Sequence, residues 1–99
     1  MRVLLIEDDT VLGAAVRDQI AADGHSVDWV PRLDAAAEAL NGAAYDLVLL
    51  DLMLPDGRGI TFLRRLRARG DVTRVIIITA LYQVSDRIEG MNAVADDHL

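Results

Sequence analysis

Short apolar runs recur along the chain, and their pattern predicts the strands of a sheet. Three of them are continuously apolar: residues 3–6, 47–50 and 75–78. Such runs are too short for helices and are typical of parallel strands that are buried on both faces of a sheet. Residues 25–30 differ, because Val27 and Trp29 alternate with polar side chains. This alternation predicts a strand near a sheet edge that exposes one face to solvent.

The segments between these runs carry apolar residues at helical spacing. Their apolar positions are Val11, Leu12, Ala15, Val16 and Ile20 in the first segment, Leu33, Ala36, Ala37 and Leu40 in the second, and Ile60, Leu63 and Leu66 in the third. This spacing places them along one face of each helix. Strands that alternate with helices predict an α/β fold, in which right-handed crossovers cover both faces of a parallel sheet.

Length and composition limit the classes of protein that fit this pattern. The 99 residues suffice for one small domain. No segment has the roughly 20 apolar residues that cross a bilayer, and the N-terminus lacks the features of a signal peptide, so we expect a soluble, cytoplasmic chain without a membrane partner. The net charge of −6 argues against direct contact with nucleic acid. The absence of cysteine excludes disulfides and thiolate chemistry.

Acidic residues and one hydroxyl follow the predicted strands. Glu7, Asp8 and Asp9 come after the first strand, Asp51 ends the third, and Thr79 ends the fourth. The carboxyl ends of parallel strands meet at one edge of a sheet, and ligands bind there near the point where the strand order reverses. Carboxylates gathered at one place repel one another unless a cation lies among them. Because oxygen ligands suit Mg²⁺, we expect a Mg²⁺ site in which Asp51 is placed to attack phosphorus.

Other polar residues have simpler interpretations. Taken alone, the acidic run at residues 7–9 is also consistent with a solvated helix start, and its place beside Asp51 and Thr79 favours the metal site. Asp56 is interpreted as a turn residue and Trp29 as part of the core. The arginines of the third helix form a solvated face: Arg64, Arg65, Arg67 and Arg69.

Four segments form a set by their order and spacing. They are IEDD at residues 6–9, DLVLLDLMLPDGRG at residues 46–59, IIITA at residues 76–80 and DRIEGMNAVADDHL at residues 86–99. Together they resemble the receiver domain of bacterial two-component response regulators, and most closely those of winged-helix transcription factors. The resemblance covers residues 1–99 and implies a flavodoxin-like, doubly wound parallel sheet in the order 2-1-3-4-5. The fifth strand and last helix would be largely missing, and an output domain would lie outside this chain.

The resemblance also implies a function and a role for each site residue. A receiver domain is a signalling switch rather than an enzyme, and it takes a phosphoryl group from a sensor histidine kinase to control an output such as transcription. Asp51 would be the phosphoryl acceptor and Thr79 the switch hydroxyl. Mg²⁺ would be bound by Asp8, Asp51 and the backbone carbonyl of Met53, with Glu7 acting through water or as a supporting acid.

The chain departs from the receiver pattern towards its C-terminus. It has no Lys, whereas receiver domains carry one after the fifth strand; Val94 stands where Gly is usual, and Leu81 and Tyr82 replace polar residues. Without a fifth strand, residues 75–78 would form an open sheet edge. We expect such a chain either to be poorly soluble or to cover the edge as a homodimer or a strand-swapped dimer.

Three other functions fit parts of the pattern. A phosphorylation-independent interaction module is favoured by the missing Lys and by Val94, and disfavoured by the intact acidic set and Thr79. A phosphatase of the haloacid dehalogenase type needs a second Asp two residues after its nucleophile, where this chain has Met53. A flavin-binding relative would place hydroxyls and backbone amides, rather than acidic residues, after the first strand.

Overall fold

The computed structural model describes residues 1–78 and 97–98 of the chain. Their elements, in chain order, are β1 (Arg2–Ile6), α1 (Thr10–Ala22), β2 (Ser26–Val30), α2 (Leu33–Gly42), β3 (Leu47–Asp51), β4 (Met53–Leu54), β5 (Gly57–Arg58), α3 (Gly59–Ala68), β6 (Val75–Ile78) and β7 (Asp97–His98). The expectations for Thr79, Leu81, Tyr82 and Val94 fall outside the described residues.

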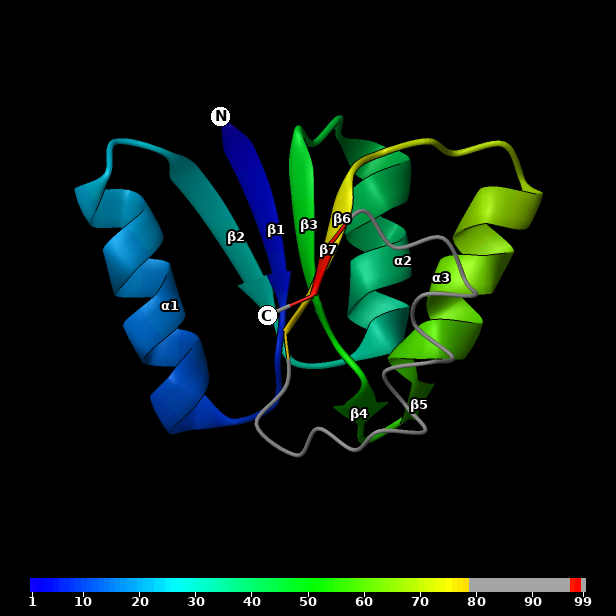
Figure 1. Ribbon diagram of the computed structural model, residues 1–99, viewed down its shortest axis with the longest axis horizontal. Coiled ribbons are helices and arrows are strands. Elements are labelled where there is room, and N and C mark those ends of the chain that lie inside the picture. Colours follow the sequence, from blue (N-terminus) through cyan, green and yellow to red (C-terminus); the bar gives the residue numbers. More distant parts are fainter. Residues whose placement is uncertain (79–96, 99) are drawn as a thin grey trace.

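Five of the strands form one parallel sheet in the order β2-β1-β3-β6-β7. The remaining two strands, β4 and β5, pair with each other in an antiparallel hairpin. Because β6 and β7 are the fourth and fifth strands of the sheet, the predicted order 2-1-3-4-5 is confirmed. Figure 1 shows that the strands share one direction and that the β4–β5 hairpin lies at the end where they terminate.

Strand β7 differs from what the sequence led us to expect of the sheet edge. Its two residues pair with β6 in parallel register, Asp97 with Ile76 and His98 with Ile77. The expectation that residues 75–78 form an open edge is therefore wrong along these two positions. The pairing gives backbone groups of Ile76 and Ile77 a partner within the same chain, and dimerisation stays a prediction.

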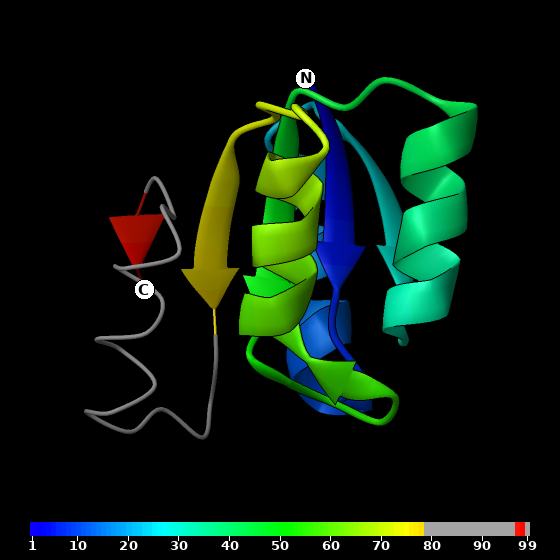
Figure 2. The same ribbon diagram turned by 90° about the vertical axis from the view of Figure 1, so that its right-hand side faces the viewer.

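The helices lie on both faces of the sheet, as the alternation of strands and helices predicted. Helix α1 covers one face, and α2 and α3 cover the other (Figures 1 and 2). The longest described helix, α1, has 13 residues. Among the helices that the structure describes, none combines the length and the apolar character needed to cross a bilayer.

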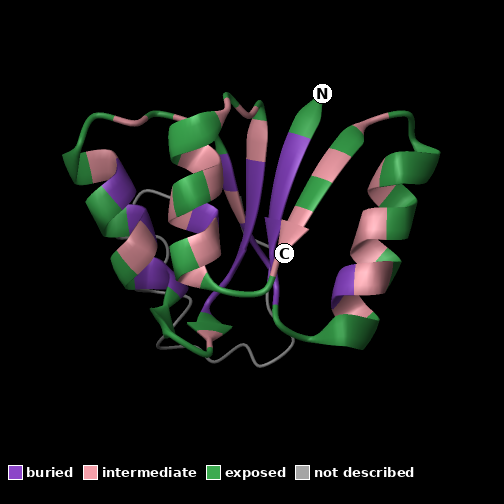
Figure 3. Cartoon of the chain, turned by 180° about the vertical axis from the view of Figure 1, so that it is seen from behind, coloured by how far each residue is buried: buried purple, intermediate pink, exposed green. Residues whose placement is uncertain are grey.

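The central strands are largely buried (Figure 3), and their alternate residues belong to two separate apolar cores. The core under α2 and α3 takes Leu4, Ile6, Val48, Leu50, Val75 and Ile77 from the sheet, and the core under α1 takes Val3, Leu5, Leu49 and Ile78. Each fully buried Leu, Ile or Val stabilises the fold by about 1.5–3 kcal/mol relative to an exposed side chain. The runs of residues 3–6, 47–50 and 75–78 are continuously apolar because both of their faces are buried.

The burial of residues in the edge strand and in the first helix tests two sequence-based expectations. Strand β2 alternates between half-buried and exposed residues and lies at one edge of the sheet, as predicted. Val11, which the helical spacing assigned to the apolar face of α1, is 80% exposed. Val16 and Ile20, also predicted for that face, do pack against the core under α1, and Gly13 is buried beside them.

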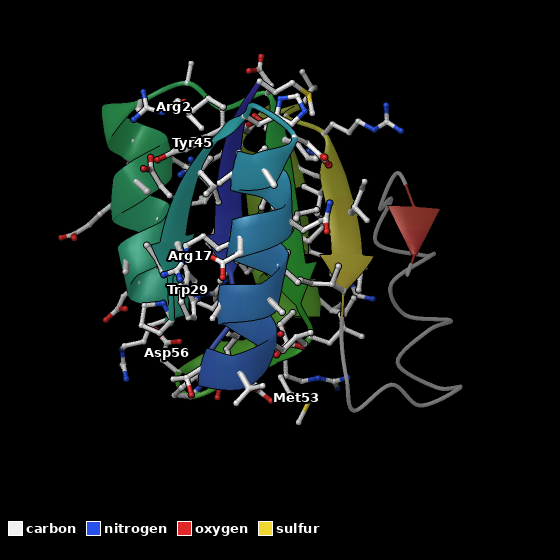
Figure 4. All side chains as sticks on the ribbon, turned by 90° about the vertical axis from the view of Figure 1, so that its left-hand side faces the viewer. Arg2, Arg17, Trp29, Tyr45, Met53 and Asp56 are labelled. Carbon is white, nitrogen blue, oxygen red and sulfur yellow. The ribbon has the colours of Figure 1, made fainter. Side chains whose placement is uncertain are left out.

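Gly13 lets α1 pack against the indole ring of Trp29. A Cβ atom at position 13 would overlap the ring atom Cζ2 and would lie 2.5 Å from Cε2. The guanidinium of Arg17, one turn further along α1, lies over the same ring at 5.2 Å from its centroid (Figure 4). Trp29 therefore occupies a slot in the helix surface that only glycine leaves open.

We expect Gly13→Ala to destabilise the chain. Alanine normally stabilises a helix interior by about 0.5–1 kcal/mol relative to glycine, but here the added methyl group must displace Trp29. The free energy of unfolding should fall by about 1–3 kcal/mol, which is typical of an overpacked core. Urea unfolding followed by circular dichroism measures this change.

Gly42→Ala is the matched control, because a Cβ atom at the end of α2 meets nothing within 4 Å. That variant should be as stable as the wild type or slightly more stable. If Gly13→Ala were as stable as Gly42→Ala, Trp29 would not fill the space beside position 13.

Candidate metal centre

Three carboxylates meet at the carboxyl edge of the sheet. Glu7 and Asp8 follow β1 directly, and Asp51 is the last residue of β3. These two strands are neighbours, with Ile6 paired to Leu50. One carboxylate oxygen from each of the three acidic residues lies within 4.8 Å of the other two. The parallel register thus brings together the acidic residues that the sequence placed at this edge.

The remaining predicted site residues are less constrained by the structure. Met53 begins β4, two residues beyond the end of β3, and is 46% exposed. The role of its backbone carbonyl as a metal ligand stays a prediction. Thr79 lies outside the described residues, so its role as the switch hydroxyl also stays a prediction.

Asp9 belongs to the first helix rather than to the carboxylate cluster. Its Oδ1 accepts hydrogen bonds from the backbone N–H of Val11 at 2.9 Å and of Leu12 at 3.0 Å. This is the N-cap arrangement, in which a side chain satisfies the free N–H groups of the first helical turn. The cap fixes where α1 begins and leaves Glu7 and Asp8 outside the helix.

Glu7 and Asp51 are buried although they carry ionisable groups. They are 1% and 6% exposed, and no described residue donates a hydrogen bond to Oε1 of Glu7 or Oδ1 of Asp51. A buried polar atom without a partner destabilises a folded protein by about 1–3 kcal/mol, and by more where the group is charged. A cation bound between the carboxylates would satisfy both oxygens. Since the donors are all oxygen, the cluster fits Mg²⁺ better than the metals that prefer nitrogen or sulfur.

The electrostatics of the cluster favour a proton on Glu7 when no cation is bound. Burial is the main cause that raises the pKa of Glu7, to about 8, and the neighbouring carboxylates of Asp51 and Asp8 raise it further. The backbone N–H of Asp9, which donates to Oε2 of Glu7 at 3.3 Å, opposes this shift. A cation that binds near neutral pH therefore replaces a proton, because the metal requires the ionised carboxylate.

Strand β2 holds the backbone of the acidic turn from one side. The N–H of Glu7 donates to the carbonyl of Val30 at 3.1 Å, and the indole Nε1–H of Trp29 donates to the carbonyl of Glu7 at 2.8 Å. Trp29, which the sequence assigned to the core, is therefore also a hydrogen-bonding support for the site. An alternating strand with an aromatic residue gives no sequence signal for this second role.

Glycine at position 59 lets helix α3 start against the backbone of Asp51. The N–H of Gly59 donates to the carbonyl of Leu52 at 2.9 Å. A Cβ atom at position 59 would overlap the carbonyl oxygen of Asp51 and would lie 3.1 Å from its carbonyl carbon. Any larger residue would therefore push α3 away from the end of β3.

Asp56 has a contact that sequence reasoning missed. It was interpreted as a turn residue, and its carboxylate in fact accepts hydrogen bonds from the backbone N–H groups of Leu33 at 2.8 Å and Asp34 at 3.0 Å. The sequence did contain one signal, because Arg32 precedes the second helix where a capping side chain is usual. A helix without a local cap leaves its first N–H groups to another partner, and here the partner is Asp56.

We expect Glu7→Gln to remove a pH dependence of stability from the metal-free chain. The pKa of Glu7 is raised from 4.5 to about 8 on folding, so the folded chain binds this proton more tightly than the unfolded chain does. The resulting stabilisation is complete below about pH 4.5 and is lost as the pH rises to about 8. Across this window the free energy of unfolding of the wild type should fall, relative to the variant, by on the order of a few kcal/mol.

Urea unfolding in a chelating buffer, at about pH 5 and about pH 8, measures this difference. Glu38→Gln on the exposed side of α2 is the control, and it should keep the pH dependence of the wild type. A slope that survives in Glu7→Gln would mean that the buried carboxylate does not hold the proton.

Comparisons with known proteins assign the chain to a family. The model of the response regulator receiver domain matches residues 3–99. The response regulator protein PmrA of Pseudomonas aeruginosa is 42% identical over 99 residues, which are 100% of this chain and 45% of PmrA. The transcriptional regulatory protein QseB of Escherichia coli O157:H7 has the same identity and the same coverage. The chain thus spans less than half the length of these curated relatives.

Solved structures agree with this assignment. The BeF3-activated N-terminal receiver domain of Klebsiella pneumoniae RstA is 29% identical with a TM-score of 0.91, and the match covers 100% of this chain and 84% of that one. The receiver domain of the Francisella response regulator 1452 is 30% identical with a TM-score of 0.90, covering 99% of this chain and 81% of that one. With a parallel sheet in the receiver strand order and three carboxylates at its carboxyl edge, the chain belongs to the response regulator receiver domain family.

Proposed function

We propose that this chain is a phosphoryl-accepting switch of a two-component system, with Asp51 as the acceptor. The observation that carries the proposal is the state of the Asp51 side chain. It is buried at the end of β3 beside two other carboxylates, and one of its oxygens has no partner among the described residues. Because this oxygen makes no hydrogen bond within the described residues, it can act as a nucleophile.

The reaction is the transfer of a phosphoryl group from a phosphohistidine of a sensor kinase. The N–P bond of the phosphohistidine breaks, and a new O–P bond forms to the carboxylate of Asp51. The carboxylate of Asp8 beside Asp51 would repel the incoming group, so the site needs a cation before it can react. Mg²⁺, when bound, supplies neutralisation of the charge on the phosphoryl oxygens.

The chain's own residues divide the work between binding and reaction. Asp8, Asp51 and the backbone carbonyl of Met53 would hold Mg²⁺, and Glu7 would support it directly or through water. The buried Glu7 would give up its proton when Mg²⁺ is bound, because a metal needs the ionised carboxylate. Thr79 would donate a hydrogen bond to a phosphoryl oxygen.

The wider protein is proposed from the relatives. PmrA is called a response regulator and QseB a transcriptional regulator, and each is more than twice as long as the matched region. We infer that residues 1–99 are the receiver part of a longer protein whose output domain contacts DNA. The net charge of −6 fits a receiver that does not itself bind nucleic acid.

The chain should gain one phosphoryl group when it is incubated with Mg²⁺ and acetyl phosphate. Asp51→Asn should gain none, because the amide is not a nucleophile. At a limiting Mg²⁺ concentration, Asp8→Asn should react at least about tenfold more slowly than the wild type, since it loses a charged metal ligand. Intact-mass spectrometry measures the product in each case.

Asp23→Asn, at the exposed end of α1, is the matched control and should react as the wild type does. Circular dichroism establishes that each chain is folded before the reaction. A folded wild-type chain that gains no phosphoryl group would overturn the proposal and favour an interaction module that works without phosphorylation.

A further inference from the structure

The carboxylate of Asp56 joins two segments that are far apart in the sequence. Asp56 lies in the turn between β4 and β5, three residues beyond Met53. Its Oδ1 accepts from Leu33 N–H at 2.8 Å and its Oδ2 from Asp34 N–H at 3.0 Å. The guanidinium of Arg32 lies 3.8 Å from Oδ2. These contacts lie at the surface, where Asp56 is an exposed residue whose side chain is 18% accessible.

Helix α2 depends on this carboxylate at its N-terminus. Arg32 occupies the N-cap position, and its side chain makes no capping hydrogen bond. The first N–H groups of a helix favour a negatively charged acceptor, because they carry the positive end of the helix dipole. These bonds, first of all the one from Leu33, hold the pKa of Asp56 below its usual range. The acceptor is therefore ionised near neutral pH.

The hairpin that carries Asp56 also carries one of the proposed metal ligands. Met53 on β4 pairs with Arg58 on β5, and Leu54 pairs with Gly57. Gly57 packs against the start of α2, since a Cβ atom there would lie 3.2 Å from Cδ1 of Leu33. Figure 4 shows Met53 and Asp56 at the same end of the sheet, away from Arg2 and Tyr45. The position of the Met53 backbone is thus tied to the start of α2.

The same junction between β2 and α2 holds the other ligand-bearing loop. Trp29 and Val30 hydrogen-bond the backbone of Glu7. Only Pro31 and Arg32 separate them from the residues that Asp56 binds. Residues 29–34 therefore contact both the turn that carries Glu7 and Asp8 and the hairpin that carries Met53. We call this segment the β2–α2 brace.

We propose that Asp56 is a positioning residue for the metal centre. By binding the β2–α2 brace, its carboxylate fixes the hairpin of Met53 relative to the acidic turn of Glu7 and Asp8, so the ligands on the two loops keep their spacing. The inference rests on the proposed function, in which these residues hold Mg²⁺. Asp56 does not contact the cation. It acts only through its hydrogen bonds to the backbone of Leu33 and Asp34.

A purely structural cap makes a different prediction from a positioning residue. Loss of a cap lowers the stability of α2, and the folded molecules still bind Mg²⁺ with the same affinity. Loss of a positioning residue lowers the affinity of the folded molecules, because their ligands no longer keep one spacing. Supports of this kind typically change metal affinity by about 10–100-fold.

The test compares Mg²⁺ binding, by isothermal titration calorimetry, in folded wild type, Asp56→Ala and Asp56→Asn. Asp56→Ala should raise the Kd for Mg²⁺ about tenfold. Asp56→Asn keeps one acceptor oxygen and should fall between the two. Asp46→Ala is the matched control, because Asp46 also accepts a backbone N–H, from Arg2 at 2.7 Å, at the opposite end of the sheet. It should lose stability and keep the wild-type Kd.

A second measurement works without metal. In two-dimensional NMR spectra of the metal-free chain, Asp56→Asn should shift the amide signals of Leu33 and Asp34 and also those of Met53 and Glu7. If Asp56→Ala fails to fold, Asp56→Asn carries both measurements. Shifts confined to Leu33 and Asp34, or a wild-type Kd in the folded Asp56 variants, would overturn the inference.

The two proposals fail in different ways. If the wild type binds no Mg²⁺, or if Asp51→Asn binds it equally well, the proposed metal site is wrong. The metal-free spectra then show by themselves whether Asp56 fixes the positions of the two loops. If the wild type binds Mg²⁺ through Asp51 and the Asp56 variants bind it equally well, only the positioning role is wrong.

Discussion

The repulsion between the buried carboxylates of Glu7 and Asp51 is the constraint that the rest of the chain must accommodate. Glu7 follows β1 and Asp51 ends the neighbouring parallel strand β3, so folding brings them together whether or not a cation is present. Without a cation, burial is the main cause that raises the pKa of Glu7, and the neighbouring Asp51 raises it further, so a proton on Glu7 relieves the repulsion. The free energy that offsets the burial of these carboxylates comes from the two apolar cores on either side of the sheet. Each buried aliphatic side chain in them stabilises the fold by about 1.5–3 kcal/mol.

The same strands that supply this stability also determine where the carboxylates lie. Within β1, Leu4 and Ile6 belong to one core and Val3 and Leu5 to the other, so a shift by one residue would exchange the two cores. The register of β1 against β3 is fixed in this way along the whole strand. The acidic turn begins at the residue after Ile6, and its position is therefore set by packing rather than by any attraction between the acidic residues.

Packing also explains how much could be predicted from the sequence. Continuous apolar runs identified the central strands, and the rule for parallel sheets placed Glu7, Asp8 and Asp51 at one edge. The supports of that site could not be predicted, because they are contacts between distant segments. The hydrogen bond from Trp29 to Glu7 spans 22 residues and the one from Leu33 to Asp56 spans 23. Neither hydrogen bond is marked by a pattern in the sequence around its residues, and the short pairing of β7 with β6 is not marked by one either.

The supports share a feature that bears on the chemistry of the site. Trp29 and Val30 hold Glu7 through its backbone carbonyl and N–H, and Gly59 holds the chain after Asp51 through the carbonyl of Leu52. Of the side-chain oxygens of Glu7 and Asp51, Oε2 of Glu7 accepts a hydrogen bond from the backbone N–H of Asp9 at 3.3 Å. Oε1 of Glu7 and Oδ1 of Asp51 are left without partners among the described residues. The backbone contacts position both loops, and these two side-chain oxygens are not needed for that purpose.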